Sequence, residues 1–232
     1  MITESNDLFQ RLDASLEREK RFLADAAHEL RTPLTVIKLQ VEQALIQPDA
    51  REMILQRLSD SVDRNQQVVE QMLLLARLEA GQMTVHSSKV IFSALIREVI
   101  AQLMPLAFKR NIEFELDIEE ITINGDSALL FSLLRNLFDN ALRHSPNNTV
   151  ISVNLFKKTQ KIIFEVVDAG TGINSEFLGE ITNRFKQLGG SDVGGYGLGL
   201  AIVSEIANIH GIRVELSNHE TKGLIVNLSW KA

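Results

Sequence analysis

The first 80 residues contain no glycine and only two prolines, Pro33 and Pro48. They are rich in Leu, Gln, Glu and Arg, which are good helix formers. Apolar residues recur at steps of three or four on both sides of a turn at Pro48-Asp49, so the pattern predicts a helical hairpin. The first row is Leu30, Leu34, Ile37, Val41 and Leu45, and the second is Leu55, Leu58, Val62, Val69 and Met72, with the polar Asn65 among them.

Two helices alone cannot bury both of their apolar faces. The economical solution is a homodimer in which two hairpins close a four-helix bundle. The alternative is a hairpin that packs as an arm on a second domain of its own chain.

Gly81 ends the second helix, and the pattern changes after it. Alternating apolar runs predict strands at 112–116, 150–155, 162–167 and 223–228. Helical patterns lie at 92–108, 126–145 and 198–210. This mixture predicts an α+β sandwich, a sheet with helices on one face. Residues 169–197 contain eight glycines and little periodicity, so we expect a mobile lid or binding loop there.

Composition excludes several classes of function. The net charge of -6, with no basic stripe, gives no reason to expect nucleic-acid binding. The absence of cysteine excludes disulfides, thiol catalysis and Cys-based zinc sites. No apolar run approaches the roughly 20 residues that span a bilayer, and the first residues do not resemble a signal peptide. We therefore expect a soluble chain, and these observations leave open that it is a fragment of an anchored protein.

A histidine on a helix is usually a surface residue without a role, but His28 has distinctive neighbours. It lies about 200° around the helix from Leu30, which favours an exposed imidazole. Glu29 is adjacent to it and could orient the ring or accept its proton. Thr32 lies one turn further on the same face, and Pro33 removes a backbone hydrogen bond there. His28, Glu29 and Thr32 are therefore candidate catalytic residues, although Thr32 could instead bond back to a carbonyl of its own helix.

Asn136 and Asn140 are one turn apart on a predicted helix. Their amide oxygens are hard ligands of the kind that Mg²⁺ accepts and shares with phosphates. Arg143 extends the same face by a turn and could meet phosphate charge. Two asparagines on a solvated face are the simpler interpretation when this string is considered alone.

Two glycine-rich segments complete the candidate site. Asp168 ends a strand, and Gly170 and Gly172 allow the backbone to approach a ligand closely. A second segment leads into an apolar helix, whose free amides and dipole suit a triphosphate. Its candidate binding residues are Gly195, Gly197, Leu198, Gly199 and Leu200.

In order along the chain, residues 22–35, 133–145, 166–173 and 194–203 resemble the H-, N-, G1- and G2-boxes of bacterial sensor histidine kinases. The whole chain is similar to the QseC/PmrB-like branch of that family. Ala169 stands where the family commonly has Asn, and Tyr196 where Ser or Thr is usual. Residues 183–186 resemble a degraded F-box, with Lys186 at a position that is more often aromatic.

The resemblance implies three segments: a signalling helix at 1–20 that leads from a membrane-proximal module, a dimerisation and histidine-phosphotransfer domain at 21–81, and a Bergerat-type ATP-binding domain at 84–232. It also implies that Asp168 binds the adenine amino group and that ATP and Mg²⁺ are bound by the N-box and glycine boxes. The ligand set then includes Asn136, Asn140, Arg143, His144, Asp168, Gly170, Gly172 and Arg184, with Asn136 and Asn140 on the metal.

The implied activity is autophosphorylation of His28, followed by transfer to an aspartate of a cognate response regulator. The His28-Glu29-Leu30-Arg31-Thr32 string also resembles kinases that dephosphorylate that partner. The chain is expected to be the cytoplasmic portion of a bacterial inner-membrane protein, and to reach the membrane only through N-terminal segments that precede it.

Two other classes of function remain open. One is a dimeric scaffold that retains nucleotide without transferring phosphate, against which the complete H- and N-boxes argue. The other is a hydrolytic ATPase or chaperone of the same nucleotide fold. Related ATPases usually carry an acid at the position of Asn136 to activate water, so Asn136 argues against this class.

Overall fold

The computed structural model describes residues 26–27, 30–47, 50–81, 83–174, 197–219 and 223–231. The chain forms two compact units, residues 1–72 and 73–232. Within the described residues, none of the helices combines the length and the apolar character needed to cross a bilayer.

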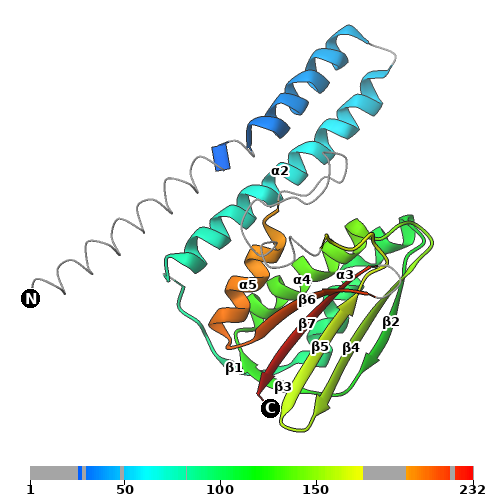
Figure 1. Cartoon of the computed structure of the whole chain (residues 1–232). Helices are drawn as coiled ribbons and strands as arrows, with labels where there is room; N and C mark the ends of the chain where they lie inside the picture. The colour runs from blue at the N-terminus through cyan, green and yellow to red at the C-terminus, as the bar shows by residue number, and fades with distance from the viewer. Residues whose placement is uncertain are drawn as a thin grey trace, which may run out of the picture. The chain divides into compact units, whose positions relative to one another are not determined.

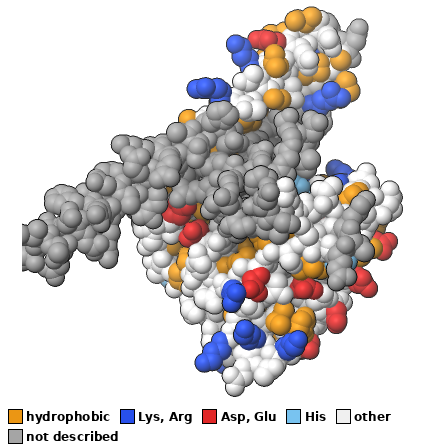
Figure 2. Space-filling view, viewed as in Figure 1, with side chains coloured by type: hydrophobic (Ala, Val, Ile, Leu, Met, Phe, Trp, Pro, Cys, Tyr) orange, Lys and Arg blue, Asp and Glu red, His pale blue; other side chains and the backbone are white. Residues whose placement is uncertain are grey.

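The first unit is a helical hairpin with two apolar rows that differ in exposure. It consists of a helix over residues 30–46 and the first part of α2, Arg51–Glu79 (Figure 1). Ile54, Val68 and Met72 of α2 are at most 5% exposed. Figure 2 shows hydrophobic side chains that remain on the surface of the hairpin. The exposed row comprises Leu34, Val41 and Leu45 on the shorter helix and Leu55, Val62 and Val69 on α2.

The hairpin is as expected, and part of the expected seam on α2 is exposed in the single chain. Leu55, Val62 and Val69 belong to the expected seam and are exposed, whereas Ile54 lies outside it and is buried. Side chains of adjacent residues on a helix point about 100° apart. A sequence pattern with steps of three and four therefore does not distinguish two neighbouring apolar rows. One row is covered within the chain and the other is left uncovered.

The second unit is a mixed sheet covered by helices on one face (Figure 1). Its large sheet has the strand order β2-β4-β5-β7-β6, in which only the β2–β4 pair is parallel. The elements, in chain order, are β1 Ser88–Ile91, α3 Phe92–Lys109, β2 Glu113–Ile118, β3 Thr122–Gly125, α4 Ser127–His144, β4 Val150–Lys158, β5 Lys161–Val167, α5 Gly199–Ile209, β6 Arg213–Asn218 and β7 Leu224–Lys231. This architecture confirms the expected α+β sandwich and adds β1, β3 and β6, which the sequence patterns did not predict.

Aromatic side chains join the helices to the sheet. Phe92 of α3 meets Phe164 of β5 edge to face, with ring centroids 5.5 Å apart. Phe164 also meets Phe138 of α4 at 6.2 Å, and Phe92 meets Trp230 of β7 at 5.5 Å. Phe92, Phe138 and Phe164 are fully buried, so these contacts form the centre of the second unit's core.

The N-terminus of α4 is capped by Asp126. Its Oδ1 accepts hydrogen bonds from the amides of Ala128 and Leu129 at 3.0 and 3.1 Å. Its Oδ2 accepts from the amide of His86 at 2.9 Å, in the segment between α2 and β1. Burial raises the pKa of Asp126, but the His86, Leu129 and Ala128 amides lower it by more, so the pKa lies below its ordinary value.

The C-terminus of α4 is held by Arg110, the residue that follows α3. Its guanidinium donates to the carbonyls of Leu142 and Ser145, the latter at 2.5 Å, and to Oδ1 of Asn147 at 3.0 Å. A cation that bonds the last carbonyls of a helix also complements the helix dipole. Arg110 thus ties the end of α3 to the end of α4.

We predict that Arg110→Lys lowers the free energy of unfolding of the second unit by about 2 kcal/mol, because an ammonium cannot make the three-bond fork. Urea unfolding followed by the fluorescence of Trp230, the single tryptophan of the chain, measures this. Arg97→Lys on the exposed face of α3 is the matched control. Equal midpoints for the two variants would show that the fork contributes nothing.

Candidate functional site

The start of α5 lies directly against the asparagine pair of α4. A carbon added at Gly199 would lie 3.1 and 3.2 Å from the amide nitrogen and oxygen of Asn140, and 3.4 Å from Oδ1 of Asn136. The close approach therefore favours glycine at this position. Two motifs about 60 residues apart in the sequence are brought together here.

The two asparagines have different surroundings. Asn136 is 7% exposed, and its Nδ2 donates to the Ser132 carbonyl at 2.8 Å. Asn140 is half-buried. Amide oxygens suit Mg²⁺ when phosphate supplies the remaining ligands. Across the described part of the chain, no group of three or more His, Cys, Asp or Glu side chains could hold a metal ion. Two amide oxygens are a donor set that fits a metal whose other ligands come from phosphate.

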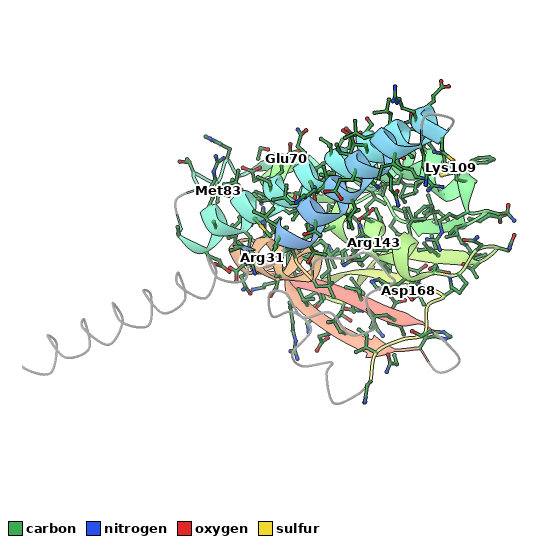
Figure 3. All side chains as sticks on the ribbon, turned by 90° about the horizontal axis from the view of Figure 1, so that it is seen from above. Arg31, Glu70, Met83, Lys109, Arg143 and Asp168 are labelled. Atoms are coloured by element: carbon green, nitrogen blue, oxygen red, sulfur yellow. The ribbon has the colours of Figure 1, made fainter. Side chains whose placement is uncertain are left out.

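Arg143 and His144 lie at the C-terminal end of α4, and Figure 3 labels Arg143 there. The Arg143 guanidinium forms an ion pair with Asp139 at 2.9 Å, and both side chains are about one-third exposed. Desolvation lowers the pKa of His144 and outweighs the attraction of Asp168. Because Arg143 already pairs with Asp139, any phosphate that contacts the Arg143 guanidinium would share it with that carboxylate.

Asp168, labelled in Figure 3, follows β5. The residue is 8% exposed. Its Oδ1 accepts from the amides of Gly170 and Leu224 at 2.8 and 3.0 Å. Its Oδ2 accepts no hydrogen bond from the described residues. Burial raises the pKa of Asp168 above its ordinary value, although these two amides and His144 act against that rise. The carboxyl group is thus held through Oδ1, while Oδ2 accepts nothing from the described residues.

The turn after Asp168 passes over the end of α4. A carbon added at Gly170 would lie 2.9 Å from the His144 carbonyl oxygen. Further along, Gly172 has φ +70 and lies against Asn218, the last residue of β6. The Asn218 amide pairs with both backbone groups of Ile173, accepting at 2.8 Å and donating at 2.6 Å. This pairing fixes the exit of the turn.

The start of α5 leaves its first amides without a side-chain cap. Gly197 has φ +65, which turns the chain into the helix, and Leu198 is the N-cap residue but makes no side-chain hydrogen bond. Leu198 is 1% exposed, so its side chain anchors the turn in the core. Gly199 and Leu200 then open the helix. Uncapped amides at a helix N-terminus favour an anion such as phosphate.

On the helical unit, Thr32 is exposed and its hydroxyl forms no hydrogen bond with the described residues. Thr35, one turn later, instead donates to the Arg31 carbonyl at 2.9 Å. His28 and Glu29 lie outside the described residues, as do Arg184, Gly195 and the rest of 175–196, including the F-box segment and most of the expected lid.

Four residues that organise this site were not identified from the sequence: Arg110, Asp126, His210 and Asn218. An aspartate just before a helical pattern is an N-cap signal, so Asp126 could have been found. Arg110 and Asn218 bond to backbone atoms of distant segments, and no local pattern marks such contacts. The same holds for His210, whose ring bonds to the backbone nitrogen of Asp126, 84 residues away in the sequence.

Two family models match the chain. Residues 18–81 match the His Kinase A (phospho-acceptor) domain, and residues 125–232 match the histidine kinase-, DNA gyrase B- and HSP90-like ATPase. Sensor protein QseC of Escherichia coli K12 is 37% identical, over 99% of this chain and 51% of that protein. Sensor protein kinase PmrB of Pseudomonas aeruginosa is 34% identical, over 98% and 49%. The chain thus spans about half the length of these relatives.

Solved structures share the fold. Acinetobacter baumannii histidine kinase AdeS superposes with a TM-score of 0.73 at 24% identity, over 88% of this chain and 97% of that one. Full-length ShkA in complex with AMPPNP superposes with a TM-score of 0.67 at 25% identity, over 90% of this chain and 45% of that one. The two family models, together with relatives that align over nearly the whole sequence, show that the chain belongs to the sensor histidine kinase family.

Proposed function

We propose that this chain transfers the γ-phosphoryl group of ATP to His28, and then from His28 to an aspartate of a response regulator. One observation carries the nucleotide half of the proposal: Asn136 and Asn140 of α4 meet Gly199 at the uncapped start of α5. The Asp168 turn lies against the end of the same helix α4. The complex of the relative ShkA with AMPPNP supports ATP as the ligand.

Each side chain would have a distinct part in binding. The free Oδ2 of Asp168 would accept a hydrogen bond from the adenine amino group, and the first amides of α5 would bind phosphate oxygens. Asn136 and Asn140 would hold Mg²⁺, whose charge compensates that of the phosphates. An asparagine amide cannot act as a general base toward water, so Asn136 favours transfer over hydrolysis. We infer functional domains at 21–81 and 84–232, with a signalling helix at 1–20.

In the transfer step, a ring nitrogen of His28 attacks the γ-phosphorus in line. The new N–P bond forms as the bond from phosphorus to the ADP oxygen breaks, and ADP leaves. The proton on the other ring nitrogen passes to Glu29, which also orients the ring. The phosphoryl group later moves from nitrogen to a carboxylate oxygen of the regulator, and Glu29 returns the proton to the ring, which restores the neutral imidazole.

We also propose that two copies of the chain associate through the exposed row on the hairpin. Leu34, Leu55 and Val62 are at least 47% exposed, and a row of such side chains is the surface that a second hairpin would cover. By family membership, the chain would act as the cytoplasmic portion of an inner-membrane sensor, with regulator and partner copy as its protein contacts.

We expect His28→Ala to abolish autophosphorylation and to leave the affinity for ATP within about threefold, because the nucleotide motifs lie in the second unit. Incubation with γ-labelled ATP and Mg²⁺ measures acid-labile, base-stable label. His86→Ala, which removes another histidine, should retain the label. Label that persists on the His28 variant would exclude this residue as the acceptor.

Asp168→Asn should weaken the binding of AMPPNP by tenfold or more. The reason is that a hydrogen bond to a charged group contributes about 1.5 kcal/mol, which corresponds to roughly a tenfold change in affinity. The asparagine side chain keeps a carbonyl oxygen that can accept from the backbone N–H groups of Gly170 and Leu224. An NH2 group, which can only donate, replaces Oδ2. Because burial raises the pKa of Asp168, a neutral side chain should not reduce stability. Calorimetric titration tests this, with the exposed Asp117→Asn as control. Unchanged affinity would contradict the adenine role.

Thr32→Ala should retain autophosphorylation and reduce regulator dephosphorylation by about a hundredfold, if the Thr32 hydroxyl positions the attacking water. Its exposure makes it available for that part. Both rates are measured on one preparation with the purified regulator, and Thr35→Ala serves as the control. A parallel fall in both rates would indicate that Thr32 only supports the helix.

A further inference from the structure

The imidazole of His210 joins the two helices that carry the nucleotide motifs. His210 is the C-cap residue of α5, and its Nδ1 lies 2.8 Å from the Ile206 carbonyl oxygen. Its Nε2 lies 3.0 Å from the backbone nitrogen of Asp126, the N-cap residue of α4. One ring therefore bridges the end of α5 and the beginning of α4.

The partners determine which ring nitrogen carries the proton. A backbone N–H can only donate, so Nε2 must present its lone pair to the Asp126 amide. Nδ1 then carries the hydrogen and donates it to the Ile206 carbonyl. A side chain at position 210 that offers only donors would face the Asp126 N–H with another donor and would lose the bridge.

The ring has little freedom to move from this place. A carbon added at Gly125 would lie 2.9 Å from Cδ2 of His210 and 2.7 Å from Cδ1 of Leu130. The residue before Asp126 is therefore in close contact with both the ring and the first turns of α4. The hydrogen bond and this packing act on the same ring, so they fix the end of α5 relative to α4.

The opposite end of α5 forms the candidate phosphate site. A carbon at Gly199 would lie 3.1 Å from the Asn140 amide, so α5 also contacts α4 at its first residue. The helix has 11 residues and is about 16 Å long, short enough to move as a rigid rod. A shift at His210 would consequently change where the first amides of α5 lie relative to Asn136 and Asn140.

We propose that His210 is a positioning residue for the triphosphate. By accepting the Asp126 N–H, it holds α5 in register with α4, and so places the amides at the start of α5 beside Asn136 and Asn140. This inference rests on the proposed function, because it assumes that ATP phosphates bind at that place. His210 itself need not touch the nucleotide.

The test uses two ligands that share adenosine and differ in phosphates. AMP has only the α-phosphate, whereas AMPPNP also has the β- and γ-phosphates that complete the triphosphate. In the whole chain, His210→Lys and His210→Ala should weaken AMPPNP binding about tenfold, the effect of one lost hydrogen bond, and AMP binding by less than about threefold. His210→Gln should stay within about threefold of the unaltered chain for both ligands, because its Oε1 can accept the Asp126 N–H.

The control is Asn208→Ala, an exposed side chain in the last turn of the same helix. Titration calorimetry gives the affinities, and Trp230 fluorescence shows that each variant is folded at the temperature used. If the Lys, Ala and Gln variants all bind AMPPNP like the unaltered chain, the inference is wrong. An equal loss for AMP and AMPPNP would also overturn it, since His210 would then only support the fold. Failure of the unaltered chain to bind AMPPNP would instead refute the proposed function itself.

Discussion

Leu134, Phe138 and Leu142 are fully buried on α4, and their packing determines where the rest of the candidate site can lie. The opposite side of the same helix presents Asn136 and Asn140 to the start of α5. Asp126 fixes the first turn, and Arg110 fixes the last. Because α4 is held along its length and at both ends, the Gly170 segment can approach it too closely to leave room for a side-chain carbon, and the Gly199 segment leaves little room for one.

The residues that could be identified from the sequence are those whose role follows from the pattern of residues within one short segment. Periodicity located the helices α3, α4 and α5, and the glycine-rich strings marked the segments that approach a ligand. The four-residue strands β1 and β3 are too short to show a period, and β6 has only two apolar residues, Val214 and Leu216. Arg110 and Asn218 act on backbone atoms about 35 and 45 residues away, so only the folded chain reveals them.

The two units reach stability by different routes. The second unit contains a continuous aromatic core that links two helices to the sheet. The hairpin instead covers one apolar row and leaves another exposed, with Leu45 72% accessible. A surface of this kind is stabilised when a further helix covers it, which couples the folding of the hairpin to association.

Asp126 uses both carboxylate oxygens on backbone amides, two in the first turn of α4 and one at His86. These bonds need the charged form, and they place the pKa below its ordinary value. The stabilisation is therefore complete above the pKa of an unfolded aspartate, and it is lost as the pH falls through the lower value of the folded state. In sufficiently acidic solution, a single proton would weaken the start of α4 and its attachment to the segment after α2 at the same moment.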